Sequence, residues 1–133
     1  QVSRKGAADF VSQADLSAER ALREELEFAR PGWNMILEES GYVKGDSSDA
    51  PTWIIDPLDG TTNFLHGIPH FAISVAVLEN KKLMAAGILD PIRDEFFFAW
   101  RDLGLRWISS IIVFQELQAS QRPLHRGCCA PHS

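Results

Sequence analysis

Two aspartates set three residues apart, followed at once by a glycine and two threonines, are the part of this chain best suited to chemistry. They lie in the run Trp53-Ile-Ile-Asp-Pro-Leu-Asp-Gly-Thr-Thr-Asn-Phe64, where Asp56 and Asp59 follow an apolar stretch typical of a buried strand. Paired carboxylates suit hard divalent cations such as Mg2+. A Gly-Thr turn that opens a short helix directs backbone N–H groups toward a phosphate. The segment therefore predicts metal-assisted phosphate chemistry.

Each candidate residue also has an ordinary structural interpretation. Asp-Pro and Asp-Gly are common turn dipeptides, so Asp56 and Asp59 can be simple turn residues. Thr61 can cap a short helix, and Asp15 stands where an N-cap for the next helix is expected. The upstream pair Glu38-Glu39 can be a solvated strand end. The Gly-Thr-Thr sequence and the preceding glutamate together favour metal ligation over turn formation.

Composition excludes several function classes. The 133 residues carry a net charge of −5 with no dense basic run, which argues against nucleic acid as a partner. No apolar run approaches the roughly 20 residues that span a bilayer, and the first residues show no signal-peptide pattern. The cysteines, Cys128 and Cys129, are adjacent, which fits neither a disulfide framework nor a zinc site. These features favour a reducing cytoplasm.

The first predicted element is a helix over residues 16–29, ended by Pro31-Gly32. Glu19 and Arg23 are spaced for an ion pair on its surface. The predicted apolar face consists of Leu22, Leu26 and Ala29.

The middle of the chain predicts a meander of antiparallel strands flanked by helix. A surface loop is expected over residues 40–51, and turns are expected at Asn80-Lys-Lys82 and Asp90-Pro91. After about residue 101 the sequence changes character, which predicts a boundary there. The predicted strands cover residues 34–37, 53–55, 71–78, 83–89 and 95–100.

These residues together resemble the bacterial inositol monophosphatase family, from about Lys5 to about Trp100. The resemblance implies an α+β fold, here the N-terminal portion of the layered αβαβα sugar-phosphatase fold. Residues 1–100 would form this incomplete region. Besides the aspartate motif, the pieces that carry the resemblance are Leu65-His-Gly-Ile-Pro-His-Phe-Ala-Ile-Ser-Val75, Asp9-Phe-Val-Ser-Gln-Ala-Asp15 and Leu37-Glu-Glu-Ser-Gly41.

The resemblance implies a set of metal ligands. Glu38, Asp56 and the carbonyl of Leu58 would hold a first Mg2+. Asp56 would bridge to a second Mg2+, which Asp59 also binds. The complete family site is expected to hold two or three Mg2+ ions.

The same resemblance implies the remaining roles. The backbone N–H groups of Gly60 and Thr61 would bind the phosphate. Thr61 and Asp15 would orient and deprotonate the attacking water, and Lys5 would support the metal and phosphate region. His66 and His70 are expected in surface or structural roles, because Mg2+ prefers oxygen ligands.

The end of the chain departs from the family. Family members are longer and carry a second motif, Trp-Asp-x-Ala-Ala-Gly, that residues 101–133 do not contain. The first family helix is also expected to be missing before Gln1. We expect residues 101–133 to be a non-family tail, and a reading-frame shift near residue 100 would explain it.

Three functions remain open on this sequence. The first is a Mg2+-dependent phosphomonoesterase that hydrolyses inositol monophosphate, or a related polyol or sugar phosphate, with a metal-activated water. The second is a truncated, inactive fragment that retains partial metal or phosphate binding. The third is a protein-interaction role like that of bacterial relatives associated with transcription. The expected partner is a small phosphate monoester, and a homodimer is expected from the family.

Overall fold

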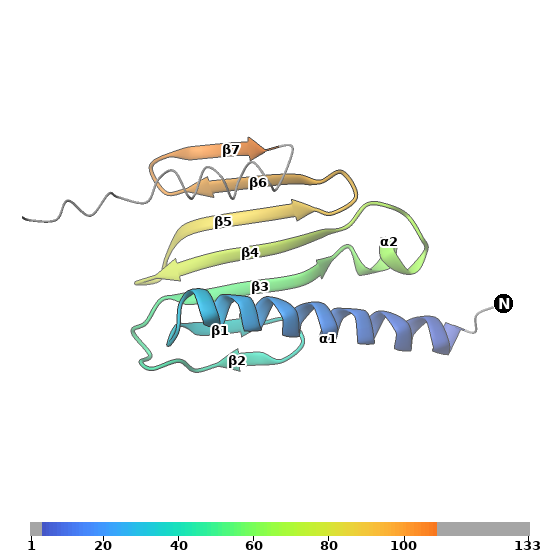
Figure 1. Cartoon of the computed structure of the whole chain (residues 1–133), viewed down its shortest axis with the longest axis horizontal. Helices are drawn as coiled ribbons and strands as arrows, with labels where there is room; N and C mark the ends of the chain where they lie inside the picture. The colour runs from blue at the N-terminus through green and yellow to red at the C-terminus, as the bar shows by residue number, and fades with distance from the viewer. Residues whose placement is uncertain (1–3, 109–133) are drawn as a thin grey trace, which may run out of the picture.

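A single mixed sheet with one long helix on it makes up the described structure (Figure 1). The computed structural model describes residues 4–108, and only the backbone of residues 4, 5, 7, 8 and 105–108. The sheet has seven strands in the order β2-β1-β3-β4-β5-β6-β7. The elements are α1 (Arg4–Ala29), β1 (Asn34–Leu37), β2 (Gly41–Val43), β3 (Thr52–Asp59), α2 (Thr61–Leu65), β4 (Ala72–Glu79), β5 (Lys82–Asp90), β6 (Glu95–Trp100) and β7 (Gly104–Ile108).

The predicted antiparallel meander is confirmed from β3 to β6, where each strand pairs with the next, and β7, which was not predicted, extends it. Asn80 and Lys81 have φ values of 51° and 61°, the backbone of a tight two-residue hairpin turn. At the next turn the Asp90 carboxylate accepts hydrogen bonds from the N–H groups of Ile92 and Arg93. Both predicted turns are therefore present.

The sheet continues beyond the predicted boundary near residue 101. Strand β7 pairs antiparallel with β6, from Phe96 opposite Ile108 to Trp100 opposite Gly104. The boundary thus falls in the turn between two paired strands. The division of the chain at this point stays a prediction, and the adjacent cysteines lie outside the described residues.

The interval predicted as a loop, 40–51, contains the short edge strand β2, so that prediction was wrong for three residues. Gly41 has a φ of 75°, which reverses the chain so that Val43 pairs with Met35 of β1. Strand β1 in turn pairs parallel to β3. The parallel pairing brings the ends of β1 and β3 to the same edge of the sheet.

Helix α1 begins at Arg4, not after Asp15, so the N-cap prediction for Asp15 was wrong. Asp15 lies inside the helix, on a buried stripe that also contains Val11 and Glu19. Packing of this stripe overrides the preference of aspartate for a cap. Of the predicted apolar face, Leu22 and Leu26 pack against the core. Ala29, at the end of the helix, is exposed.

The predicted ion pair between Glu19 and Arg23 was also wrong. Arg23 Nε instead bonds to Glu27 Oε1 at 2.9 Å, one turn in the other direction. The reason is that Glu19 points into the protein and has other partners. None of the helices within 4–108 is long and apolar enough to cross a membrane.

The core lies between α1 and the β1–β3 part of the sheet. Met35, Leu37 and Ile55 form its fully buried centre. Side chains alternate along a strand, so these residues share the face that α1 covers. Helix α1 contacts both β3 and α2, whereas the β4–β7 part has no described helix over it (Figure 1). Partly buried residues around this centre are Leu22, Leu26, Val43, Trp53 and Val75.

Candidate metal and phosphate site

The aspartate motif lies at the end of β3 and not after it. The sequence predicted a strand over residues 53–55, but β3 runs from Thr52 to Asp59. Its pairing with β4 shifts register between Asp56 and Asp59, around Pro57. Proline has no N–H to give to the ladder, which fits an irregular strand here. Oδ1 of Asp56 accepts the Leu58 N–H at 3.1 Å and so fixes this bend.

Gly60 turns the chain from β3 into α2. Its φ of 94° and ψ of 34° place it in the left-handed region that glycine tolerates. A Cβ atom at this position would lie 3.1 Å from the carbonyl oxygen of His70. Immediately after it, the Thr61 hydroxyl donates a hydrogen bond to the Leu58 carbonyl at 3.1 Å. The segment from Asp56 to Thr61 is therefore one continuous hydrogen-bonded turn.

Glu38 reaches the motif through the parallel pairing of β1 with β3. Leu37 is opposite Ile55, so Glu38, the first residue after β1, lies beside Asp56 of β3. The Glu38 N–H donates to the Ile55 carbonyl at 3.3 Å. A hydrogen bond with the Asp56 carboxyl raises the pKa of Glu38 to about 7, and desolvation and neighbouring negative charges act in the same direction.

Asp15 contributes a third carboxyl group from α1. Its side chain is buried, and Oδ1 has no hydrogen-bond partner within the described part of the chain. Burial raises its pKa, and the negative charges of Glu39, Asp56 and Glu19 raise it further. Lys5 lies in the first turns of the same helix, where only the backbone is described.

These groups fit a magnesium ion. Carboxylates held close together repel each other unless one is protonated or a cation lies between them. Among the described residues no three acidic, histidine or cysteine side chains converge tightly enough to hold a metal ion. Mg2+, however, is often bound by one or two carboxylates with several waters. Glu38 and Asp56 supply carboxylate oxygens of this kind, the Leu58 carbonyl expected as a further ligand accepts the Thr61 hydroxyl, and Asp59 is exposed.

The structure therefore places Asp15, Glu38 and Asp56 close enough for their charges to raise the pKa values of Asp15 and Glu38, and Gly60 and Thr61 follow Asp56 along the chain. It directs the Thr61 hydroxyl to the Leu58 carbonyl. The two histidines, His66 and His70, are exposed, as expected.

Sequence reasoning missed two residues that shape this region. Glu19 is 3% exposed, and Asn34 is 1% exposed. Glu19 lies one helical turn after Asp15. If the helix had been predicted to start before Asp15, this spacing would have placed both residues on the same face. Asn34 carries no comparable signal, because its four hydrogen bonds reach residues 8 to 16 positions away.

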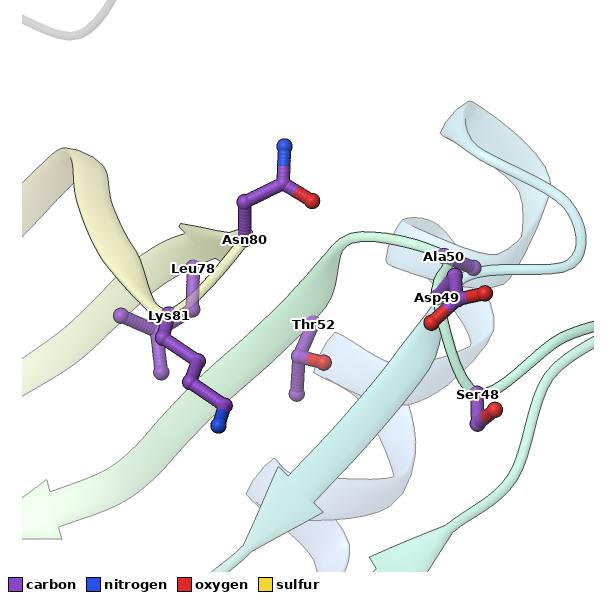
Figure 2. A pocket seen from close by; sticks show the side chains of 7 residues that line it. All are labelled: Ser48, Asp49, Ala50, Thr52, Leu78, Asn80 and Lys81. Carbon is purple, nitrogen blue, oxygen red and sulfur yellow. The ribbon is translucent and has the colours of Figure 1, made fainter.

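A hollow lies at the end of β3 opposite the aspartate motif. It has a volume of about 360 Å³ and is open to solvent (Figure 2). Thr52 starts β3 whereas Asp56 is near its end, so this hollow is separate from the acidic cluster. The residues that line it are Ser48, Asp49, Ala50, Thr52, Leu78, Asn80 and Lys81.

Comparison with known proteins agrees with this fold. The chain forms an α+β sheet in which the acidic end of β3 runs into a Gly-Thr turn. A sequence profile described as the inositol monophosphatase family matches residues 1–132. The chain belongs to the inositol monophosphatase family.

Named relatives fall into two groups. The chain is 55% identical over 104 residues to the inositol-1-monophosphatase of Rhizobium meliloti (strain 1021), which covers 78% of this chain and 39% of the relative. It is 42% identical over 104 residues to the Nus factor SuhB of Escherichia coli (strain K12), with 78% and 39% covered. The chain thus spans about two fifths of the length of these curated relatives.

Solved structures give the same result. The extragenic suppressor protein suhB of Bartonella henselae superposes with a TM-score of 0.71 and 48% identity, over 74% of this chain and 41% of that one. The inositol monophosphatase of Anabaena sp. PCC 7120 has a TM-score of 0.66 and 33% identity, over 76% and 40%. These values confirm the predicted fold class.

Proposed function

We propose that this chain carries part of the site of a Mg2+-dependent phosphomonoesterase that hydrolyses inositol monophosphate or a related polyol or sugar phosphate. The observation that carries the proposal is the contact between the carboxyl groups of Glu38 and Asp56, next to the buried Asp15. The Rhizobium relative is named inositol-1-monophosphatase, which supports the substrate class. Because the chain spans about two fifths of its relatives, the activity of a whole protein is part of the proposal.

The proposed metal ligands are Glu38, Asp56 and the Leu58 carbonyl for one ion, with Asp56 and Asp59 facing a second. When bound, Mg2+ neutralises the phosphate, polarises it and lowers the pKa of a water. The bend fixed by the Leu58 N–H holds the Asp56 carboxylate in place before any ion binds. A site that is organised in advance needs little reorganisation during the reaction.

The proposed catalytic roles belong to Asp15, Thr61 and Lys5. A buried carboxylate with a raised pKa and a free oxygen is suited to accept a proton from water at Asp15 Oδ1. The Thr61 hydroxyl, anchored on the Leu58 carbonyl, would help to orient that water. The backbone N–H groups of Gly60 and Thr61 would bind the phosphate. Lys5 would add a positive charge to the phosphate region, as the family resemblance implies.

A second candidate is a role in transcription complexes. It is favoured by the relatives named Nus factor SuhB, to which the chain is 39 to 44% identical. A third is a fragment that binds metal or phosphate without turnover. Binding to purified RNA polymerase would support the second candidate, and metal binding without phosphate release would support the third. The main proposal also includes a cytoplasmic location, a phosphate monoester as the binding partner and a homodimeric state.

The test is phosphate release from inositol 1-phosphate by the 133-residue chain, with and without Mg2+, beside Asp56→Asn. Release that requires Mg2+ and is abolished by Asp56→Asn would support the enzyme. Asp94→Asn is the matched control, because Asp94 is an exposed turn residue outside the site. Mg2+ binding measured by calorimetry separates an inactive binding fragment from a chain that binds no metal. A chain that binds no Mg2+ would contradict the proposal.

A further inference from the structure

Glu19 is a deeply buried carboxylate that the proposed chemistry does not use. Its side chain is 3% exposed, on the face of α1 that packs against the sheet. Glutamate is almost never buried this far without a partner, because removing a charge from water is costly. The salt bridge found within 4–108 joins Arg23 to Glu27 and does not involve Glu19. Hydrogen bonds must therefore hold it.

Both oxygens of Glu19 bond to the turn that follows β1. Oε2 accepts the backbone N–H of Glu39 at 2.9 Å, and Oε1 accepts the hydroxyl of Ser40. Bonds to an ionised carboxylate are stronger than bonds between neutral groups. They join residues 20 and 21 positions apart, so they tie α1 to this turn.

The turn so held contains Glu38, the proposed metal ligand. The Glu38 N–H bonds to the Ile55 carbonyl on the β3 side, and the next N–H, of Glu39, bonds to Glu19 on the α1 side. Glu38 is therefore fixed from two elements at successive peptide groups. Its own side chain is exposed, so packing alone does not hold it against Asp56.

A purely structural role explains Glu19 less well. An apolar side chain of similar size at a buried helix position generally stabilises as much as a buried charge or more. The charge of Glu19 also adds to the repulsion around Asp15 and raises the pKa of that residue. Binding of a cation nearby would offset both the burial of the Glu19 charge and its repulsion of Asp15.

We propose that Glu19 is a positioning residue that holds the Glu38–Ser40 turn so that the Glu38 carboxyl meets Asp56. This inference rests on the proposed metal site. Partners outside the direct ligands commonly change metal affinity about 10–100-fold when they are removed. Glu19 acts through Glu38 and does not touch the metal itself.

The test compares Glu19→Ala with Glu19→Gln in the 133-residue chain, with Mn2+ as the probe and electron paramagnetic resonance as the readout. Glutamine keeps an oxygen for the Glu39 N–H, and its amide can donate to the Ser40 hydroxyl. We expect Glu19→Ala to weaken Mn2+ binding about 10–100-fold. Glu19→Gln should bind at least about tenfold more tightly than Glu19→Ala, because it keeps the geometry and loses only the charge.

Amide hydrogen exchange supplies a readout that does not depend on metal. The Glu39 amide should be protected in the unchanged chain and in Glu19→Gln, and should exchange rapidly in Glu19→Ala. Amides of the β3–β4 ladder should stay protected in all three. Glu24→Ala is the matched control, because Glu24 is an exposed glutamate on the same helix.

Three results would overturn the inference. The first is that Glu19→Ala and Glu19→Gln lose the same amount of Mn2+ affinity, and the second is that Glu19→Ala loses none. The third is that the Glu39 amide of the unchanged chain is not protected from hydrogen exchange. If Glu19→Ala does not fold, Ser40→Ala removes one bond and leaves α1 intact; unchanged Mn2+ affinity there also overturns it. If the unchanged chain binds no Mn2+, the proposed function fails, and the exchange at Glu39 still decides whether Glu19 holds the turn.

Discussion

At the scale of single residues, the site is defined by carboxyl groups that are closer together than their charges favour. Glu38 and Asp56 share a hydrogen bond, and Asp15 is buried beside them with an oxygen that has no partner within 4–108. The pKa of Glu38 is therefore raised to about 7, and that of Asp15 is raised as well. In the proposed site, protons and cations would compete for the same oxygens.

The first prediction concerns the pH dependence of Mg2+ binding. Glu38 must lose its proton to bind the ion, so the apparent Mg2+ affinity should rise with pH and level off above about pH 7. Calorimetric titration over this range checks it. Glu38→Gln should bind weakly and show a smaller dependence, whereas Glu25→Gln, an exposed change on α1, should behave as the unchanged chain. A pH-independent affinity would contradict the prediction.

When no metal is present, Glu38 should make the free energy of unfolding fall as pH rises, which is opposite to the trend of Mg2+ affinity. The folded state holds the Glu38 proton more tightly than the unfolded state, in which the pKa is near the ordinary glutamate value of 4.5. The contribution of Glu38 to the free energy of unfolding is therefore complete below about pH 4.5 and is lost as pH rises through about 7. Because Glu38 is exposed, the effect should be measured at low salt. Melting curves with and without Mg2+ should diverge as pH increases.

The second prediction compares two glycines in left-handed conformations. Gly60 and Gly67 have φ values of 94° and 67°, so alanine should cost each about 1–2 kcal/mol of unfolding free energy. Only at Gly60 would the new Cβ meet backbone, at 3.1 Å from His70 O and 3.3 Å from Phe71 Cα. Gly60→Ala should therefore be the more destabilising change in urea denaturation. Equal costs would show that the crowding is unimportant.

At the scale of elements, a helix and two strands bring the acidic groups to one edge of the sheet. Helix α1 carries Asp15 and Glu19 on its buried stripe, β1 leads into Glu38, and β3 carries Asp56. The segment between β1 and β3 must be held in place for this to work. Asn34 does so, because its amide donates to the carbonyls of Ser47 and Ala50, and its oxygen accepts from the Gly45 N–H and the Tyr42 hydroxyl.

The third prediction is that Asn34→Ala destabilises the chain by about 2–4 kcal/mol, because four hydrogen bonds are lost at a buried position. Urea denaturation measures the change. Asn63→Ala removes a single bond, to His70 O, in an exposed setting and should cost about 1 kcal/mol or less. A similar cost for both variants would mean that Asn34 does not organise the segment.

At the scale of the whole molecule, the buried apolar core is small and lies on one side. The buried apolar residues of the described structure are few, and the β4–β7 part of the sheet lies away from α1 (Figure 1). Natural domains are stable by only about 5–15 kcal/mol, so each core side chain matters. The buried apolar residues are Val11, Met35, Leu37, Ile55 and Leu58.

The fourth prediction follows from this small core. Leu37→Ala should lower the free energy of unfolding by about 2–5 kcal/mol, because Leu37 is 2% exposed and leaves a cavity. Leu83→Ala is the matched control, since Leu83 is 54% exposed on β5, and it should change stability by about 0.5 kcal/mol or less. Thermal and urea unfolding followed by circular dichroism compare the two. An equal effect of both would contradict the placement of the core.

Sequence patterns were enough to predict the meander strands up to β6, the turns between them and the family. Those features depend on local patterns, such as the apolar alternation in β4 and the turn residues at Asn80 and Asp90. Tertiary structure alone decided that α1 starts at Arg4, because packing of its buried stripe outweighs the capping preference of Asp15. It also decided that Glu19 bonds to the turn after β1, since contacts between residues 20 positions apart leave no local signal.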